Sequence, residues 1–144
     1  MDNMVVVTIL AAAISSAVAA LVSFRINRES KKERFDLQLQ NIIAYSMEYP
    51  YLEQKTFTDT WDPSLATNDE RYQRYAHYFS IVFNFIYDIC LWKKYKQKDI
   101  ENYIGIKFWV WKHEKYWKNP QTKSENDIYG EKFSDFIEKY IPYG

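Results

Sequence analysis

A stripe of polar side chains in an otherwise apolar stretch is the strongest candidate for chemistry in this sequence. The stretch "ERYQRYAHYFSIVFNFIYDICLW", from Glu70 to Trp92, is mostly aromatic and aliphatic. Its polar residues recur at intervals of three and four, so a helix would place them on one narrow face. These residues are Gln73, His77, Ser80, Asn84 and Asp88, with Arg74 beside them. Such a face could hydrogen-bond a small polar or phosphate-bearing ligand in an internal cleft.

Two other interpretations of this polar stripe stay open. In the first, the stripe is the solvent edge of a central bundle helix, since the other positions are mostly apolar. In the second, the stripe meets a protein partner. A buried His77 or Asp88 without hydrogen-bond partners would be costly, so the burial of the stripe distinguishes the interpretations.

Arg71 and His77, in "RYQRYAH", carry a resemblance to a known family. Their spacing resembles the Arg-x(4-6)-His motif of HEPN-type ribonucleases, which are all-helical. The resemblance covers seven residues and implies that the arginine and the histidine act together on an RNA backbone. Where that family usually has a polar residue directly after the arginine, this chain has Tyr72.

The N-terminal stretch predicts a membrane anchor. Residues 4–24 carry no charge, and as a helix they would extend about 31 Å, enough to cross a hydrocarbon core. A cleaved signal peptide fits less well, because the first residues lack Lys and Arg and the apolar run is long. The sequence therefore predicts a single-pass protein of the cell membrane, with residues 1–24 as its transmembrane anchor in the lipid bilayer.

A cationic cluster follows this stretch directly, in residues 25–34. Its members are Arg25, Arg28, Lys31, Lys32 and Arg34. By the positive-inside rule they would lie at the membrane surface, with the N-terminus outside and the C-terminal domain in the cytoplasm. The single cysteine, Cys90, agrees with that compartment because it excludes an intrachain disulfide.

Small residues repeat every four positions in the apolar stretch, which predicts association with another helix. One row is Ala11, Ser15 and Ala19, and the other is Ala12, Ser16 and Ala20. We expect Ala12, Ser15, Ser16, Ala19 and Ala20 to form the contact in a homo-oligomer or with a partner in a membrane complex.

Residues 35–144 predict an aromatic-rich helical domain. The N-terminal helix meets no strong breaker before Pro50, and residues 50–68 predict a long irregular connection. Further helices are expected from about 69 to 96, 99 to 117 and 124 to 142. The fold class is therefore all-α, with a transmembrane helix that continues into a bundle of about four helices.

The stretch "KFWVWKHEKYWK" interleaves lysines with aromatic residues, which suggests nucleic-acid binding. On a helix, however, the aromatic residues and the lysines occupy different faces. This favours a core face made by the aromatic residues and a solvated face made by the lysines. The other interpretation is that the basic face turns toward the membrane or a phosphate ligand. DNA is therefore not an expected partner. His113 lies on the apolar face, and "HEKYW" lacks the second histidine of a zinc-protease motif. No metal and no cofactor are expected.

In outline the chain resembles small bacterial single-pass membrane proteins with a helical cytoplasmic domain of unknown function. The resemblance is carried by the anchor, the basic run and the helix containing "YFSIVFNFIYDI". We expect a non-enzymatic sensor, scaffold or effector that binds a ligand or protein partner and self-associates, in bacterial defence or stress response. The alternatives are an accessory subunit of a larger membrane complex and a HEPN-like ribonuclease.

Overall fold

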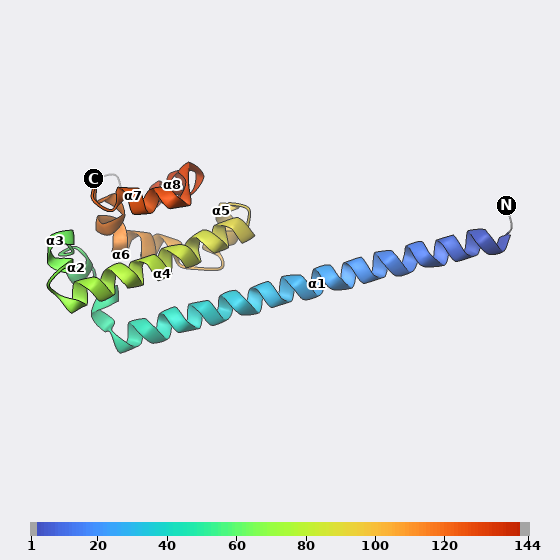
Figure 1. Cartoon of the computed structure of the whole chain (residues 1–144), viewed down its shortest axis with the longest axis horizontal. Coiled ribbons are helices and arrows are strands. Elements are labelled where there is room, and N and C mark those ends of the chain that lie inside the picture. Colours follow the sequence, from blue (N-terminus) through green and yellow to red (C-terminus); the bar gives the residue numbers. More distant parts are fainter. Residues whose placement is uncertain (1–2, 142–144) are drawn as a thin grey trace. The chain divides into compact units, whose positions relative to one another are not determined.

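The computed structural model describes residues 3–141, and the side chains of residues 3–11 and of Ser124 lie outside that description. Its internal contacts divide the chain into two units, residues 1–38 and 39–144. Throughout the described residues the secondary structure is helical without a strand (Figure 1), so the all-α prediction is confirmed.

The first helix, α1, spans Asn3–Glu48 and contributes all of the described part of the first unit. It ends where the sequence predicts, because Pro50 disfavours a helical conformation at Tyr49. Side chains from Ala12 to Arg34 are exposed. The Ser16 hydroxyl donates a 2.9 Å hydrogen bond to the Ala12 carbonyl, so its polar group is satisfied within the helix.

The prediction of a transmembrane anchor is corrected by this structure. Among the described residues, no helix is both long enough and apolar enough to cross a membrane. In the part of α1 whose side chains are described, from Ala12 onward, Ala and Ser alternate with the larger apolar residues and charged residues begin at Arg25. The single-pass topology and the cell-membrane localisation are therefore wrong for the part of the chain that the structure describes.

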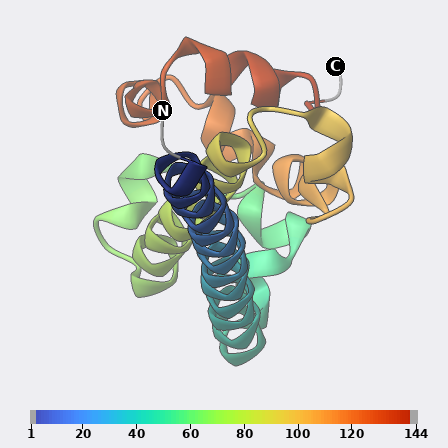
Figure 2. The ribbon, with the colours of Figure 1, turned by 90° about the vertical axis from the view of Figure 1, so that its right-hand side faces the viewer.

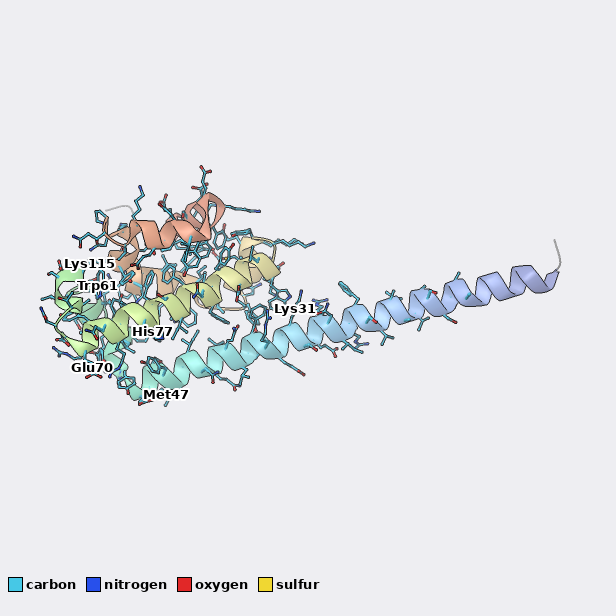
Figure 3. All side chains as sticks on the ribbon, in the orientation of Figure 1. Lys31, Met47, Trp61, Glu70, His77 and Lys115 are labelled. Carbon is cyan, nitrogen blue, oxygen red and sulfur yellow. The ribbon has the colours of Figure 1, made fainter. Side chains whose placement is uncertain are left out.

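The connection after α1 is helical rather than irregular. It consists of the 3-10 turn η1, Pro50–Glu53, and the short helices α2, Lys55–Thr58, and α3, Pro63–Ala66. Trp61 anchors it, since its side chain is buried and its ring lies 4.2 Å from the Tyr116 ring. Figure 3 labels Trp61 and Lys115, which lie where this connection meets α6, Ile106–Lys118.

Helix α4, Glu70–Trp92, is the central element of the second unit. Asp69 caps it by accepting a 2.8 Å hydrogen bond from the Arg71 backbone. The helix ends four residues earlier than the predicted Lys96. The cause is local, because Lys94 and Tyr95 adopt left-handed backbone conformations that cannot continue an α-helix.

The remaining predicted helices are broken into shorter ones, so the bundle has more elements than four. The predicted helix 99–117 is α5, Gln97–Glu101, followed by α6, with Gly105 between them. The predicted helix 124–142 is α7, Lys123–Asn126, the 3-10 turn η2, Asp127–Tyr129, and α8, Glu131–Glu138. Gly130 makes that second break because its φ of +78° is left-handed.

Aromatic rings hold α4, α6 and α8 together. Phe79 of α4 stacks on Tyr116 of α6 at 4.0 Å between ring centroids, and Phe83 stacks on Trp117 at 5.2 Å. Phe133 of α8 packs edge-on against Trp117 at 5.8 Å. These contacts agree with Figure 2, in which α8 (red) lies over the region of α4 and α6.

Candidate functional site

The predicted polar stripe of α4 lies mainly at the surface. Gln73, His77 and Asn84 are exposed, while Ser80 and Asp88 are half-buried. The Ser80 hydroxyl donates to the carbonyl of Ala76 within the same helix. None of these residues lines the hollow between α6, α7 and α8 or the more open one over α2 and α6.

Two members of the predicted ligand site instead contact other elements of the fold. Arg74 donates a 2.8 Å hydrogen bond to the Tyr51 hydroxyl, lies 4.1 Å above the Tyr49 ring and pairs with Glu70. The Asn84 side chain accepts a 2.8 Å hydrogen bond from the Tyr129 hydroxyl. Both contacts fasten α4 to its neighbours.

Arg71 and His77, the pair that resembles the ribonuclease motif, are not joined in this structure. The guanidinium of Arg71 is paired with Asp69, with 2.8 Å between Nη2 and Oδ2. Six residues of helix separate the two side chains by about 9 Å along the axis and place them on different faces.

The residues predicted for the membrane surface and for helix association all lie on α1. Arg25 pairs with Glu29 at 3.3 Å, and the Arg34 guanidinium lies 4.9 Å from the Phe35 ring centre. Arg28, Lys31 and Lys32 are exposed. The side chains of Ala12, Ser15, Ser16, Ala19 and Ala20 are exposed as well, whereas that of Ala11 lies outside the described residues.

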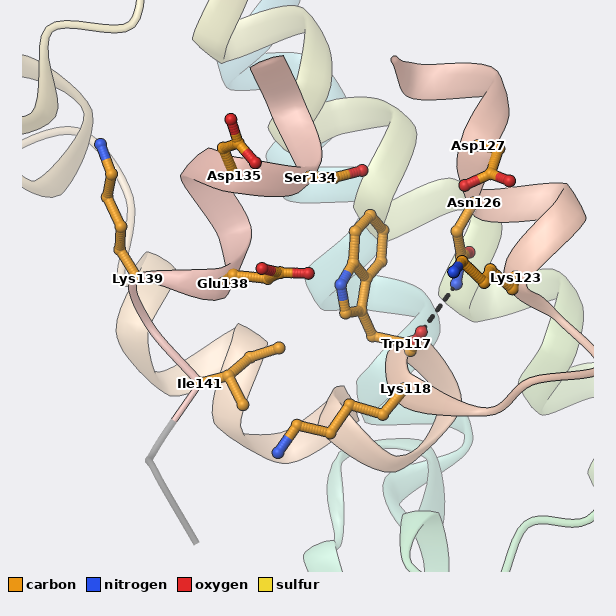
Figure 4. A pocket seen from close by; sticks show the side chains of 10 residues that line it. All are labelled: Trp117, Lys118, Lys123, Asn126, Asp127, Ser134, Asp135, Glu138, Lys139 and Ile141. Carbon is orange, nitrogen blue, oxygen red and sulfur yellow. Dashed lines mark hydrogen bonds between the residues drawn. The ribbon is translucent and has the colours of Figure 1, made fainter. Parts of the chain in front are cut away.

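A hollow of about 740 Å³ opens where α6, α7 and α8 meet (Figure 4). Its lining residues combine one large aromatic ring with charges of both signs: Trp117, Lys118, Lys123, Asn126, Asp127, Ser134, Asp135, Glu138, Lys139 and Ile141. In Figure 4 the Trp117 indole stands at the centre of these side chains, with Glu138 and Lys139 on one side and Lys123 and Asn126 on the other. The volume falls in the range of small-molecule sites.

Hydrogen bonds at the end of α6 fix one wall of this hollow. The Asn126 side chain donates a 2.9 Å hydrogen bond to the Trp117 carbonyl, and the Thr122 hydroxyl donates a 2.7 Å bond to the Tyr116 carbonyl. Both carbonyls belong to the last helical turn, which leaves such groups without a partner inside the helix. The contacts therefore hold α7 in place beside Trp117.

The charged side chains around the hollow do not neutralise one another. Within the described structure, no ion pair joins any two of its six charged lining residues. Lys118 pairs with a carboxylate outside the lining, that of Glu114, at 3.7 Å. The hollow thus presents cations and anions side by side, next to an indole that is 7% exposed.

Sequence reasoning missed this hollow. It assigned Trp117 to the core and Lys118 to a solvated face, and it read residues 124–142 as one helix. The signal that could have found it is Gly130, a residue poorly suited to a helix interior. A chain that breaks there leaves α7 and α8 as separate walls.

A buried polar cluster joins η1, α4 and α6, and its centre is Glu53. The Glu53 carboxylate accepts a 2.6 Å hydrogen bond from the Tyr78 hydroxyl and a 2.5 Å bond from Lys112 Nζ. On α6, His113 is fully buried, and its Nδ1 lies 3.0 Å from the Tyr75 hydroxyl. His113 is therefore a hydrogen-bonded core residue, as its position on the apolar face predicted.

Charge keeps Glu53 ionised in this cluster. Burial raises the pKa of its carboxyl, but the nearby His113 imidazole and the hydrogen bonds from Lys112 and Tyr78 outweigh that effect and lower the pKa to about 2. The pKa of His113 is lowered below its usual value, chiefly by burial, so the imidazole is neutral near pH 7. The ionised Glu53 carboxylate, paired with Lys112, is therefore a structural link between η1 and α6.

A second, more open hollow lies over the ion pairs of α2 and α6. Lys55, in its lining, pairs with Asp59 at 2.6 Å and with Glu114 at 3.1 Å. Because its central charges are already neutralised, it offers less to a ligand than the hollow beside Trp117. Among the residues that the structure describes, no group of three or more His, Cys, Asp or Glu side chains is arranged to hold a metal ion.

Comparison with known proteins adds no identification. No protein family, no curated protein and no solved structure matches this chain.

Proposed function

We propose that this chain is a non-enzymatic sensor or scaffold whose hollow between α6, α7 and α8 binds a small zwitterionic ligand, with the free ends of short peptides as the simplest case. The observation that carries the proposal is the set of mutually unpaired lysines and carboxylates around Trp117. Within the predicted α4 stripe, Arg74 and Asn84 then fasten the helix to neighbouring elements.

The chemistry of the hollow selects for a ligand with both charges. An anion alone would meet the carboxylates of Asp135 and Glu138, and a cation alone would meet Lys123 and Lys139. A zwitterion can satisfy both sets. The half-buried side chain of Ile141 and the small exposed part of the Trp117 indole provide an apolar surface for the rest of the ligand.

Self-association through α1 is the second part of the proposal. Between Ala12 and Arg34, six large apolar side chains of this helix are more than half exposed: Ile14, Val18, Leu21, Val22, Phe24 and Ile26. Apolar surface of this kind marks an interaction site. The small side chains of Ala12 and Ser16 allow a second copy to approach closely, and the Ser16 hydroxyl already has its partner within the helix.

The ligand proposal is tested with a pool of tripeptides that have free termini. The purified full chain is incubated with the pool, separated by rapid gel filtration, and the retained peptides are identified by mass spectrometry. We expect retention of a subset, and loss of retention when the same peptides are acetylated and amidated at their ends. A chain that retains no tripeptide at millimolar pool concentrations would refute the site.

Charge variants on α8 locate the binding. Glu138→Gln and Lys139→Gln each remove one lining charge, and each should weaken binding about fivefold, which corresponds to roughly 1 kcal/mol for a partly exposed charged contact. Glu131→Gln and Lys132→Gln are matched controls, because they lie on the same helix outside the lining and are exposed. Equal effects in both sets would contradict binding in this hollow.

The self-association proposal has its own test. Crosslinking of the wild-type chain should yield a dimer or larger oligomer, and Ala12→Leu with Ser16→Leu should reduce it, because bulky side chains prevent close approach. Ala13→Leu with Ala17→Leu adds the same bulk on a neighbouring face and serves as the control. An unchanged crosslinking pattern in the first variant would exclude this contact.

A further inference from the structure

A second surface of the domain lies at the end of α4 and shares no residue with the hollow. The segment "LWKKYKQK", residues 91–98, contains four lysines, at positions 93, 94, 96 and 98. Lys94, Lys96 and Lys98 are exposed. Among the described residues, none of the four lysines forms an ion pair, whereas Lys55, Lys112 and Lys118 elsewhere do.

The backbone of this segment is held in an unusual conformation. Lys94 and Tyr95 have φ values of +53° and +58°, a region that favours glycine. The Tyr95 amide donates a 2.8 Å hydrogen bond to the Cys90 carbonyl, and this bond closes the end of α4. The turn is therefore a defined structural feature.

Packing accounts for Tyr95 but not for Lys94. The Tyr95 ring lies edge-on to the Phe136 ring at 5.7 Å, and Lys132 Nζ lies 4.5 Å from the tyrosine ring centre. Lys94 has an exposed side chain at a position where glycine would fit without strain. A strained residue with no packing role is a reason to look for a functional one.

Aromatic rings accompany the lysines. Trp92 and Tyr103 lie edge-to-face at 5.4 Å, and Lys93 Nζ lies 3.8 Å from the centre of the Trp92 ring. Both rings are half-buried, so each keeps some accessible surface. Unpaired lysines beside accessible aromatic rings are the features that bind single-stranded nucleic acid without sequence preference.

We propose that residues 91–98 form a docking surface for single-stranded RNA, in which Lys94, Lys96 and Lys98 contact phosphates and Trp92 contacts a base. A flexible phosphate chain can follow lysines that point in different directions from a tight turn. A folded acidic protein would instead have to present carboxylates in matching positions. The segment contains no arginine, whose planar guanidinium can form two parallel hydrogen bonds to one phosphate. Its lysines would instead contact the phosphates as point charges.

Fluorescence anisotropy with a labelled oligouridine of about 15 nucleotides tests this proposal. The full chain should bind it, and log K should fall linearly with log salt concentration. Each phosphate contact on a single strand contributes about 0.7 to that slope, so the triple variant Lys94→Gln, Lys96→Gln, Lys98→Gln should lower the slope by about 2. Its affinity at low salt should fall on the order of tenfold or more.

Two control variants distinguish RNA binding at this surface from binding driven by the overall charge of the chain. The triple variant Arg28→Gln, Lys31→Gln, Lys32→Gln removes the same charge from α1 and should leave the slope within about 0.7 of the wild type. Lys94→Gly keeps the turn and should still weaken binding. No binding by the wild-type chain, or equal losses in the two triple variants, would overturn the proposal. Equal competition by poly-glutamate of the same charge would also overturn it, in favour of an acidic protein partner.

Discussion

The Nε2 atom of His113 lies 3.5 Å from Oε1 of Glu53, and this buried nitrogen has no hydrogen-bond partner in the described structure. The same carboxylate is bonded to Tyr78 and Lys112. Glu53 therefore neutralises one cation and faces one neutral imidazole, inside a contact that joins η1 to α4 and α6. The stability of the domain should depend on this one carboxylate.

Glu53→Gln tests this dependence directly. The amide keeps the shape of the side chain but leaves the ammonium of Lys112, 13% exposed, without its counter-charge. We expect the free energy of unfolding to fall by roughly 3 kcal/mol, as when one partner of a buried pair is removed. Chemical denaturation measures the change. Glu70→Gln, in the exposed pair with Arg74, should change it by less than about 1 kcal/mol, and similar losses in both variants would contradict the account.

Acid should destabilise the domain in two stages. The lowered pKa of His113 means that the unfolded chain takes up a proton below about pH 6.5 while the folded chain does not, so stability falls as the pH drops. The Glu53 pKa of about 2, against 4.5 in the unfolded chain, adds a stabilisation that is complete above about pH 4.5 and is lost toward pH 2. Denaturation at pH 7, 5.5, 4 and 3 tests this, and Glu53→Gln should flatten the profile below pH 4.5. A wild-type stability that stays constant from pH 7 to 3 would refute it.

The turn after α4 gives a prediction that separates stability from binding. Lys94→Gly relieves a left-handed conformation that costs a non-glycine residue about 1–2 kcal/mol. Glycine also gives the unfolded chain more conformational entropy, which lowers the stability of the fold by about 0.4–1 kcal/mol. Its free energy of unfolding should therefore equal or exceed that of the wild type. Lys94→Ile should be less stable than the wild type, because a β-branched side chain fits this region worst. Thermal unfolding measures the stability of both variants. If Lys94→Ile were more stable than Lys94→Gly, the turn would not be strained.

The break between η2 and α8 depends on Gly130. A Cβ added there would meet no atom within 4 Å, so Gly130→Ala acts only through the strain of its φ of +78°. We expect a loss of about 1–2 kcal/mol in stability and weaker binding of tripeptides in the hollow. Gly105→Ala is the matched control, because that residue also has open space but a φ of −75°, and it should be neutral or slightly stabilising. A neutral Gly130→Ala would show that the break does not need glycine.

Local patterns predict the helices of this fold but only some of their ends. The end of α1 before Pro50 and the apolar face of α4 follow from a strong breaker and a regular period. The stop at Lys94 depends on a left-handed backbone conformation that the sequence does not display, whereas the breaks at Gly105 and Gly130 fall at glycines. Short helices arise there because packing against α4 and α6 outweighs weak local preferences.

The candidate hollow was missed for a related reason. Its lining comes from the end of α6, from α7 and from α8, and these meet only once the break at Gly130 is known. The α4 stripe, by contrast, was visible because one regular helix carries it. Its burial could not be predicted, because exposure depends on neighbours such as Tyr51 and Tyr129 that lie far away in the sequence.

Indole NMR of Trp117 tests the central claim most directly. The chain has five tryptophans, and Trp117→Phe assigns the Nε1–H signal of the one that lines the hollow. The best-retained free tripeptide is titrated into the nitrogen-15-labelled full chain. We predict that the Trp117 signal shifts in a saturable way while that of Trp61, buried away from the hollow, stays in place. A saturable titration that leaves the Trp117 signal unmoved would contradict the account.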